Sequence, residues 1–317
     1  MATAVQTRHR VNLLDQVGDR AARLITLIFA ASIVLAALLI VYVLWTDSAA
    51  ARHRLGWGFL ASSQWNPVTE QFGGLPFIYG TVLTSVLALL ISVPLGVGSA
   101  IFLSELAPAN TSNALTFLVE LLAAIPSVIY GLLAIFTLVP LMRSYVEPFL
   151  RSVLGFLPLF QGIAYGVGYL TAGVILAVMT FPFIISVSRE ALLAVPREQR
   201  EAALALGATH WETTWDVVVP YARLGIMGSI FLGLARALGE TMAVTMVIGN
   251  SAAIHVSLFA PGHTIAAVIA NEFAEATGDV YRGVLIELGL VLFCLTIILN
   301  GAARLMIVAT TRKGSQR

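Results

Sequence analysis

Long runs of apolar residues alternate with short polar segments along most of the chain. A helix needs about 20 apolar residues to cross a hydrocarbon core of about 30 Å. Six runs reach this length and predict transmembrane helices over residues 24–45, 79–104, 114–142, 162–188, 222–249 and 283–308. Several contain proline or glycine, which membrane helices tolerate where neighbouring helices satisfy the freed backbone groups. The pattern therefore predicts a packed helical bundle.

The composition supports this interpretation. Hydrophobic residues make up 58% of the 317 residues, charged residues 11%, and the mean hydropathy is +0.90. Soluble domains contain about 45–50% apolar and about 25% charged residues. The expected fold class is therefore an all-α polytopic membrane protein surrounded by a lipid bilayer. A net charge of +1 provides no field that would attract nucleic acid, so no nucleic-acid partner is expected.

The positive residues between the predicted helices indicate their orientation, because cytoplasmic segments carry an excess of Arg and Lys. With a cytoplasmic N-terminus, twelve of the eighteen Arg and Lys residues fall inside and five outside. The eighteenth, Arg236, lies within a predicted helix. Both termini are therefore expected in the cytoplasm. The predicted parts are a transmembrane domain (24–309), cytoplasmic tails (1–23 and 310–317), extracytoplasmic loops (46–78 and 250–282) and a cytoplasmic loop (189–221).

The second extracytoplasmic loop contains a helical pattern over residues 264–276. Apolar residues recur there at helical spacing, with polar residues between them, which predicts a short amphipathic helix. The pattern fits a lid over a pathway and simple packing on the bundle equally well. His255 and His263 in the same loop are interpreted as surface histidines, and no metal site is expected.

The cytoplasmic loop predicts two helices joined by a tight turn. Pro196 is suited to the start of a helix, and Gly207 can adopt the left-handed conformation that ends it. Thr209 and Glu212 have the spacing of a capping box, so a second helix is expected to start immediately and run toward Pro220. The first helix would expose Glu201, Ala202 and Ala203, which are small enough to enter a groove on a partner.

This loop resembles the EAA loop of ABC importer permeases. EAALALG at 201–207 and VVVP at 217–220 match its pattern, although valines replace the aliphatic residues of the usual Ile-x-Leu-Pro ending. Three further segments, IPSVIYGLLAIFTLVPL, RALGETMAV and IANEFAEA, are similar to the PstC permease subunits of bacterial phosphate ABC importers. The resemblance runs from about residue 57 to the end of the sixth predicted helix.

The resemblance implies a type I ABC importer permease that translocates inorganic phosphate across the bacterial inner membrane. It also implies a homologous PstA-like second permease, two PstB-like ATPase subunits and an extracytoplasmic PstS-like phosphate-binding protein as partners. In such an assembly, Glu201, Ala202, Ala203 and Gly207 would couple ATP hydrolysis to alternating access.

The residues themselves indicate that this chain does not hydrolyse ATP. A Walker A loop needs Gly-Lys-Ser/Thr, and the sole lysine, Lys313, precedes Gly314 in the tail. We find no recognised catalytic motif and expect neither catalytic residues nor a cofactor. The chain is therefore predicted to be a permease rather than an enzyme, with ATPase activity supplied by a partner.

Two charged residues in the fifth predicted helix need an explanation, because charges within a membrane are costly and usually functional. If the helix were continuous, Arg236 and Glu240 would lie one turn apart on the same face. One interpretation is an ion pair that neutralises itself. The favoured interpretation is a substrate pathway in which Arg236 binds phosphate oxygens and Glu240 accepts the proton that phosphate carries and sulfate lacks.

Two alternative functions remain open at this point. An ion-coupled secondary transporter would use Glu240, Glu120 and Glu287 as a proton relay, whereas purely structural roles for Glu120 and Glu287 are also consistent with the sequence. An ABC permease for another oxyanion, such as sulfate or molybdate, would share the EAA loop. A membrane enzyme has no catalytic constellation to support it.

Overall fold

The computed structural model describes the backbone of residues 13–314 and the side chains of residues 21–305. The charges predicted for the tails at Arg8, Arg10 and Arg317 lie outside the described residues. Six described helices are long and apolar enough to cross a membrane: Ala21–Asp47, Leu75–Leu106, Ser127–Leu154, Tyr169–Leu193, His210–Gly239 and Asp279–Leu305. The predicted number is confirmed, but the third, fourth and fifth helices have different boundaries.

The chain divides into two units, and the first contains the helix α1 (Leu13–Asp47). Apolar side chains such as Leu27, Phe29 and Ile33 are exposed along it. A helix that is apolar on all sides is typical of a membrane span, so the first predicted span is confirmed. The helix begins at Leu13 and therefore extends into the segment expected as a tail.

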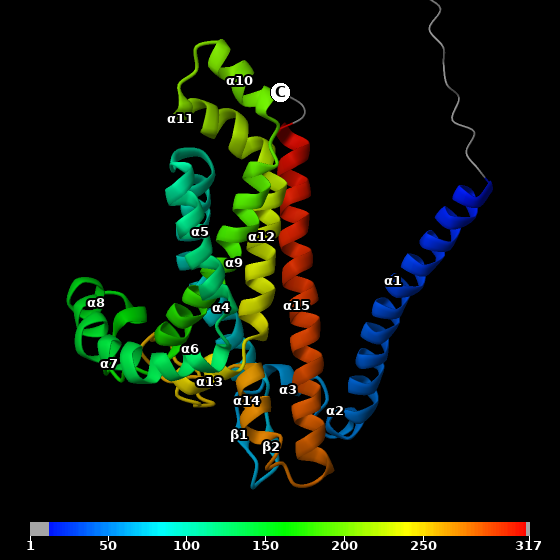
Figure 1. The fold of residues 1–317 in the computed structure, drawn as a ribbon. Helices are drawn as coiled ribbons and strands as arrows, with labels where there is room; N and C mark the ends of the chain where they lie inside the picture. Colours follow the sequence, from blue (N-terminus) through cyan, green and yellow to red (C-terminus); the bar gives the residue numbers. More distant parts are fainter. Residues whose placement is uncertain (1–12, 315–317) are drawn as a thin grey trace, which may run out of the picture. The chain divides into compact units, whose positions relative to one another are not determined.

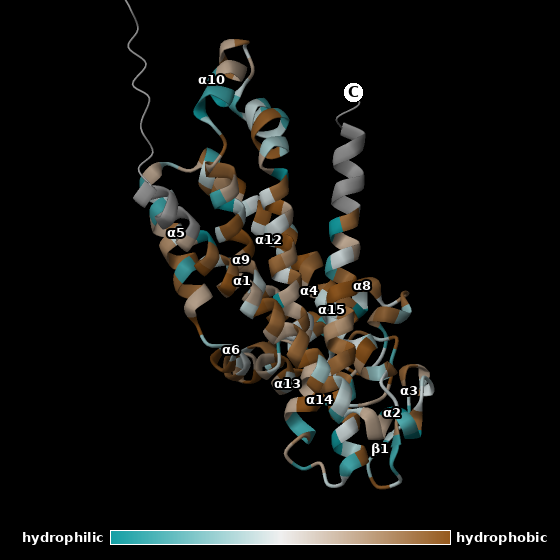
Figure 2. Ribbon diagram, turned by 90° about the vertical axis from the view of Figure 1, so that its right-hand side faces the viewer, coloured by the Kyte–Doolittle hydropathy of each residue, from teal (hydrophilic) through white to brown (hydrophobic). Residues whose placement is uncertain are grey.

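The second unit, from Ser48 onward, is organised around long helices that run side by side (Figure 1). They are α4 (Leu75–Ile101), α9 (Tyr169–Leu193), α12 (Val219–Gly239) and α15 (Asp279–Gly314). Figure 2 shows that they are mainly hydrophobic, whereas hydrophilic residues gather near α10 and β1 at the two ends. This distribution is the one expected of a bundle whose middle lies in a bilayer.

Small residues bring α4 and α9 close together. A Cβ at Gly96 would lie 2.7 Å from Ile184, and a Cβ at Gly173 would lie 2.7 Å from Leu87. Real Cβ atoms do not approach so closely, so larger residues would push the helices apart. These contacts make α4 and α9 a tightly packed pair.

The third predicted span is wrong, because residues 114–142 form parts of two helices. α5 (Ala109–Ala124) ends before Ile125, which is extended (φ −67°, ψ 127°), and α6 (Ser127–Leu133) begins after Pro126. Proline disfavours a helical conformation in the residue before it and cannot donate a backbone hydrogen bond. Figure 1 shows α5 alongside the long helices and α6 turned across them.

The remaining helices of this region contain π-helical turns. After α6 the chain forms η2 (Ala134–Leu138), α7 (Val139–Leu141), η3 (Met142–Val146), α8 (Glu147–Leu154) and the short 3₁₀ helix η4 (Pro158–Phe160). Elsewhere, η1 (Phe102–Leu106) follows α4, and η5 (Thr213–Val218) links α11 (His210–Glu212) to α12. A proline follows each π-helical turn two residues later, at positions 108, 140, 148 and 220. The wider turns accommodate a ring that would clash with the carbonyl four residues earlier.

The fourth span begins later than predicted, at Tyr169 rather than at residue 162. Glu147 is fully buried, and its Oε2 accepts a 3.1 Å hydrogen bond from the backbone N–H of Gly166. The hydroxyl of Thr171 donates to the carbonyl of Gly166 over 2.7 Å. These bonds hold the preceding segment as a loop rather than as the first turn of α9.

The end of the second unit opposite α10 is a compact cap. It contains α2 (Ala49–Leu55), α3 (Gly58–Ala61), the antiparallel strands β1 (Trp65–Asn66) and β2 (Gln71–Phe72), and α14 (Ile265–Glu272). The predicted short helix is confirmed as α14. Ile265 and Val268 are fully buried against Phe77 and Leu285, so α14 packs on the bundle. Its contacts favour the packing interpretation over a lid.

Candidate functional site

Arg236 lies in the last turn of α12, within a membrane-spanning segment. Its Cζ is 4.2 Å from the centroid of the Phe183 ring on α9, a distance typical of a cation–π interaction. Its Nε is buried and has no hydrogen-bond partner among the described residues. The guanidinium therefore rests on an aromatic face with donor capacity that the protein leaves unused. An anion could satisfy such a group in a low-dielectric setting.

Glu240 does not lie on the same helix as Arg236. α12 ends at Gly239, and Glu240 is extended (φ −70°, ψ 129°) before the short helix α13 (Met242–Val247) begins. Its Oε1 accepts a 3.4 Å hydrogen bond from the backbone N–H of Ala243, in the first turn of α13. A carboxylate there satisfies one of the free N–H groups at a helix start.

The predicted continuous helix over 222–249 is therefore wrong beyond Gly239. The expected one-turn spacing between Arg236 and Glu240 is lost with it, and no ion pair joins these two described side chains. The interpretation as a self-neutralising intrahelical pair loses its geometric basis. Both residues still flank the same helix end, on either side of a break in the backbone.

The cytoplasmic loop expected from the sequence has the predicted local structure. α10 (Arg197–Ala205) follows Pro196, and Gly207 adopts φ +91°. The N–H of Gly207 donates to the carbonyl of Leu204 over 3.0 Å, and that of Ala208 donates to Ala203 over 3.2 Å. This pair of bonds is a Schellman motif. The predicted glycine cap is confirmed.

The second predicted helix starts with the expected capping box. The hydroxyl oxygen of Thr209 accepts a bond from the N–H of Glu212 over 3.3 Å, and Glu212 Oε2 accepts from the N–H of Thr209 over 2.8 Å. The helix continues through Pro220 into α12 rather than ending there. The turn between α10 and α11 thus leads directly into the helix that carries Arg236.

The surface of α10 is available to another molecule. Glu201 and Ala202 are exposed, and Ala203 is half-buried. Leu206 at the helix end has 90% of its surface exposed, which is unusual for a large aliphatic residue. Such an exposed apolar side chain beside small residues is typical of an interaction surface. Figure 1 shows α10 and α11 at the end of the unit, away from the β strands.

Comparison with known proteins assigns the chain to a family. Residues 92–309 match the model of the binding-protein-dependent transport system inner membrane component. The phosphate transport system permease protein PstC of Mesorhizobium japonicum is 50% identical over 84% of this chain and 82% of its own length. The PstC protein of Xylella fastidiosa is also 50% identical, over 81% of each chain. This chain belongs to the PstC family of permeases.

Solved structures show the same fold at low sequence identity. A bacterial alginate ABC transporter, solved with a periplasmic protein bound to alginate pentasaccharide, has a chain that matches with a TM-score of 0.60. The match covers 90% of this chain and 94% of the other, at 15% identity. A chain of the MetNI methionine ABC transporter matches with a TM-score of 0.51 and 19% identity, over 74% and 92% of the two chains. The fold is that of a type I ABC importer permease.

As a PstC family member, the chain is a multi-pass inner-membrane permease subunit that is not itself catalytic. Importers of this class work with ATPase subunits and a binding protein. The resemblance noted from the sequence is confirmed, and so are the predicted fold class and the assignment as a permease.

The carboxylates of the proposed proton relay are distributed over separate elements. Glu120 is exposed on α5, whereas Glu287 on α15 forms a 3.6 Å ion pair with Arg52 of α2. No hydrogen bond or ion pair joins any two of Glu120, Glu240 and Glu287, whose side chains are all described. The structure therefore provides Glu287 with a structural partner and does not assemble a relay.

The two histidines of the loop 250–282 differ from each other. His255 is exposed, and its carbonyl accepts a 3.2 Å hydrogen bond from the hydroxyl of Tyr79. The prediction of a surface position is wrong for His263, which has 3% of its surface exposed and packs edge-on against Phe77. Burial lowers the pKa of His263 to about 4 from the ordinary 6.5. The residue is therefore neutral at pH 7.

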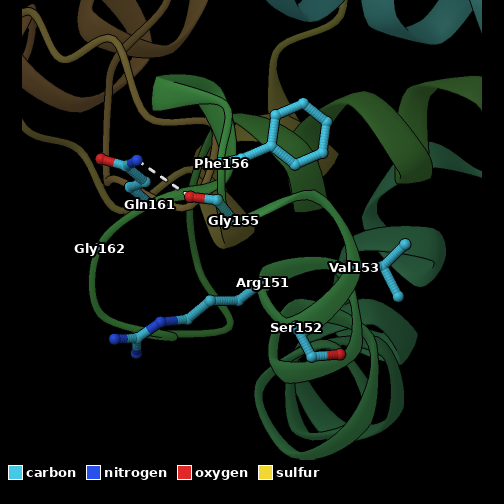
Figure 3. Close-up of a pocket in the computed structure, with 7 residues that line it drawn as sticks. All are labelled: Arg151, Ser152, Val153, Gly155, Phe156, Gln161 and Gly162. Carbon is cyan, nitrogen blue, oxygen red and sulfur yellow. Dashed lines mark hydrogen bonds between the residues drawn. The ribbon is translucent and has the colours of Figure 1, made fainter.

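A polar depression of about 500 Å³ lies where α8 meets the loop before α9 (Figure 3). Its lining residues are Arg151, Ser152, Val153, Gly155, Phe156, Gln161 and Gly162. The amide of Gln161 donates a 3.0 Å hydrogen bond to the carbonyl of Gly155. The depression is distinct from the Arg236 site and lies on different elements.

Sequence reasoning missed Phe183 as a member of the candidate site. Phe183 and Arg236 are separated in sequence by the second half of α9, the loop 189–221 and most of α12. An aromatic residue in an apolar span is ordinary, so no local pattern distinguishes it. Only the packing of α12 on α9 brings the ring to the guanidinium.

Proposed function

We propose that this chain is the subunit that translocates inorganic phosphate in an ATP-driven importer of the bacterial inner membrane. The observation that carries the proposal is the Arg236 guanidinium, which lies in a membrane-spanning helix with a buried Nε and no hydrogen-bond partner among the described residues. The PstC proteins that are 50% identical to it are named as phosphate transport permeases, which identifies the anion.

Arg236 would bind the anion during passage. The ring of Phe183 covers one face of the guanidinium and leaves its edges, which carry the N–H donors, for phosphate oxygens. Stacking also restricts the orientation of the planar group, so less entropy is lost when an anion binds. A charge that loses its water without gaining a partner costs several kcal/mol. The site is therefore suited to an anion that enters together with water, binds Arg236 and leaves again.

Glu240 would select among anions. Phosphate near neutral pH carries a proton and can donate a hydrogen bond to a carboxylate, whereas fully ionised sulfate can only be repelled by it. The break between α12 and α13 places Glu240 in extended backbone beside the helix end that carries Arg236. The carboxylate would also prevent Arg236 from holding the anion too tightly to release it.

The assembly would contain a PstA-like second permease, two PstB-like ATPase subunits and a PstS-like binding protein. α10 would enter a groove on an ATPase subunit, with Glu201, Ala202 and Ala203 in contact and Gly207 shaping the turn. Because the ATPase subunits lie in the cytoplasm, the loop 189–221 and the tails 1–23 and 310–317 would lie on the cytoplasmic side. The transmembrane domain 24–309 would then expose its loops 46–78 and 250–282 on the opposite side.

Reconstitution tests the proposal. The complete complex in proteoliposomes, supplied with the binding protein on the outside and ATP on the inside, should accumulate radiolabelled phosphate only when ATP is hydrolysable. Uptake that ignores ATP and collapses with a protonophore would favour an ion-coupled secondary transporter instead. Accumulation of sulfate or molybdate in place of phosphate would assign the permease to another oxyanion.

A further inference from the structure

Arg200 connects the coupling helix α10 to two transmembrane helices. Its Nε donates to Glu105 Oε2 over 3.2 Å, and its Nη2 donates to Glu105 Oε1 over 2.8 Å. The same Nη2 donates to the carbonyl of Leu192 over 2.8 Å, and Nη1 donates to the carbonyl of Val195. One guanidinium therefore bonds to the end of α9, to the turn after it and to η1 at the end of α4.

The contact is sheltered from solvent. The Glu105 side chain has 9% of its surface exposed and that of Arg200 has 21%. Beneath them, a cluster that includes Ile101, Leu192 and Val218 packs the ends of α4, α9 and η5 together. Two parallel bonds between a guanidinium and a carboxylate fix direction as well as distance. The leucine and valine carbonyls belong to a helix C-terminus, where a cation is favourable.

The ion pair between Arg189 and Glu190 lacks these features. Arg189 reaches Glu190, its neighbour in sequence, over 3.4 Å, and the Glu190 side chain is 75% exposed. Such surface pairs contribute little. Arg200 and Glu105 are 95 positions apart in sequence, and α10 itself has no fully buried residue. Arg200 is thus a principal polar attachment of an otherwise exposed helix.

We propose that Arg200 is a positioning residue that transmits movement of α10 to α4 and α9. The inference rests on the proposed function, because it assumes that an ATPase partner moves α10. A displacement of α10 alone would break these four hydrogen bonds. It would leave the half-buried guanidinium of Arg200 and the buried carboxylate of Glu105 unpaired, which is costly. The ends of α4 and α9 therefore follow α10. Because α9 carries Phe183, the movement reaches the ring that orients Arg236.

The experiment measures phosphate molecules imported per ATP hydrolysed by the complete complex in proteoliposomes. Arg200→Gln and Glu105→Gln should each lower this ratio by about fivefold or more while ATP hydrolysis continues. A change of this size is the one that ordinary coupling energies between two sites produce. The double variant should be no worse than Arg200→Gln, because that single variant already removes the contact between the two side chains. Arg200→Lys keeps the positive charge but cannot form two parallel bonds to the carboxylate, so its ratio should lie between those of Arg200→Gln and the unmodified complex.

Arg197→Gln is the matched control, since Arg197 is exposed on the same helix, one turn before Arg200. It should leave the ratio unchanged. If Arg200→Gln prevents assembly, Glu105→Gln decides, because it preserves the bonds from Arg200 to both carbonyls. An unchanged ratio in assembled Glu105→Gln and Arg200→Gln complexes overturns the proposal. Loss of assembly in both variants also overturns it and assigns the contact to assembly alone.

The unmodified complex separates this inference from the proposed function. Failure of the unmodified complex to import phosphate with ATP refutes the proposed function and this inference with it. Normal import by the unmodified complex, together with normal ratios in the variants, refutes only the role of Arg200.

Discussion

The guanidinium of Arg236 lies 4.2 Å from the ring centroid of Phe183, although the two residues belong to different helices. The ring occupies one face of the cation, and the buried Nε remains without a hydrogen-bond partner among the described residues. Stacking of this kind stabilises a cation by about 0.5–2 kcal/mol and also fixes its plane. The pair therefore holds the planar guanidinium in an orientation in which its N–H donors can bind an anion.

Replacement of Phe183 tests that arrangement. Phe183→Leu keeps an apolar side chain of similar size but removes the aromatic face, so the guanidinium loses its fixed orientation. Phosphate uptake by the assembled complex should fall by about threefold to thirtyfold, the equivalent of a cation–π interaction. Phe183→Tyr keeps the face and should retain most of the uptake. Equal uptake by the leucine and tyrosine variants would show that the ring only fills space.

Replacement of Arg236 should have a larger effect. Arg236→Gln removes the charge that phosphate would bind, and uptake should fall by at least about a hundredfold while the complex still assembles, because charge-assisted bonds contribute about 1.5–3 kcal/mol each. Arg223→Gln is the matched control, since Arg223 is exposed near the other end of the same helix. Normal uptake by an assembled Arg236→Gln complex would remove Arg236 from the pathway.

The local structure of the loop 189–221 was predictable because its signals act over a few residues. Gly207 ends α10 through its own backbone conformation, and Thr209 and Glu212 bond to each other's backbone. Hydrophobic runs likewise predicted the number of spans. In each case, the residues that determine the structure are neighbours in sequence.

The missed features depend on a single break or on distant contacts. Pro126 divides one apolar run into α5 and α6, a change that hydrophobicity alone does not register. The end of α12 at Gly239 similarly interrupts an apolar run. The contacts of Arg236 with Phe183, and of Arg200 with Glu105, arise from helix packing, so no spacing rule could connect them.

His263 should make the stability of the cap opposite α10 dependent on pH. Its pKa is about 4 in the folded state and 6.5 when unperturbed, so between these values the unfolded chain binds more protons. Stability therefore rises with pH through this window. The buried His263 should lower the free energy of unfolding by about 2 kcal/mol at pH 5 relative to pH 7.5. Thermal unfolding in detergent at both pH values measures the difference.

The matched control for that measurement is His263→Gln, which cannot titrate in this range. It should show a smaller loss of stability between pH 7.5 and pH 5 than the unmodified chain. His255→Gln should not change the loss, because the His255 side chain is exposed and lies outside the buried cluster around His263. Identical pH dependence in the unmodified and His263→Gln proteins would contradict the prediction.

Gly207 tests the coupling surface. Its φ of +91° strains any residue with a Cβ, at a cost of about 1–2 kcal/mol, although no heavy atom lies within 4 Å of the position where that Cβ would be. Gly207→Asp adds a charge to the proposed contact with the ATPase and should abolish ATP-driven uptake while the spans still insert. Gly207→Asn adds a similar volume without the charge and tolerates left-handed backbone better than most residues, so it should keep most of the uptake. Comparable uptake by both variants would argue against a charge-sensitive partner groove.

Glu240 provides the test of anion selection. Glu240→Gln retains an oxygen that can accept the bond from the N–H of Ala243, so the start of α13 should be preserved. It removes the negative charge that would repel sulfate, since like charges brought together cost several kcal/mol.

The external binding protein would select the anion before it reached the permease, so discrimination must be measured without it. In detergent-solubilised complex lacking the binding protein, sulfate should displace radiolabelled phosphate at about tenfold lower concentration from Glu240→Gln than from the unmodified protein, a difference of about 1.4 kcal/mol. Glu120→Gln, on the exposed face of α5, is the control and should leave the sulfate concentration unchanged. If Glu240→Gln and the unmodified complex discriminate equally, selection against sulfate does not depend on this carboxylate, and Glu240 acts instead as the cap of α13.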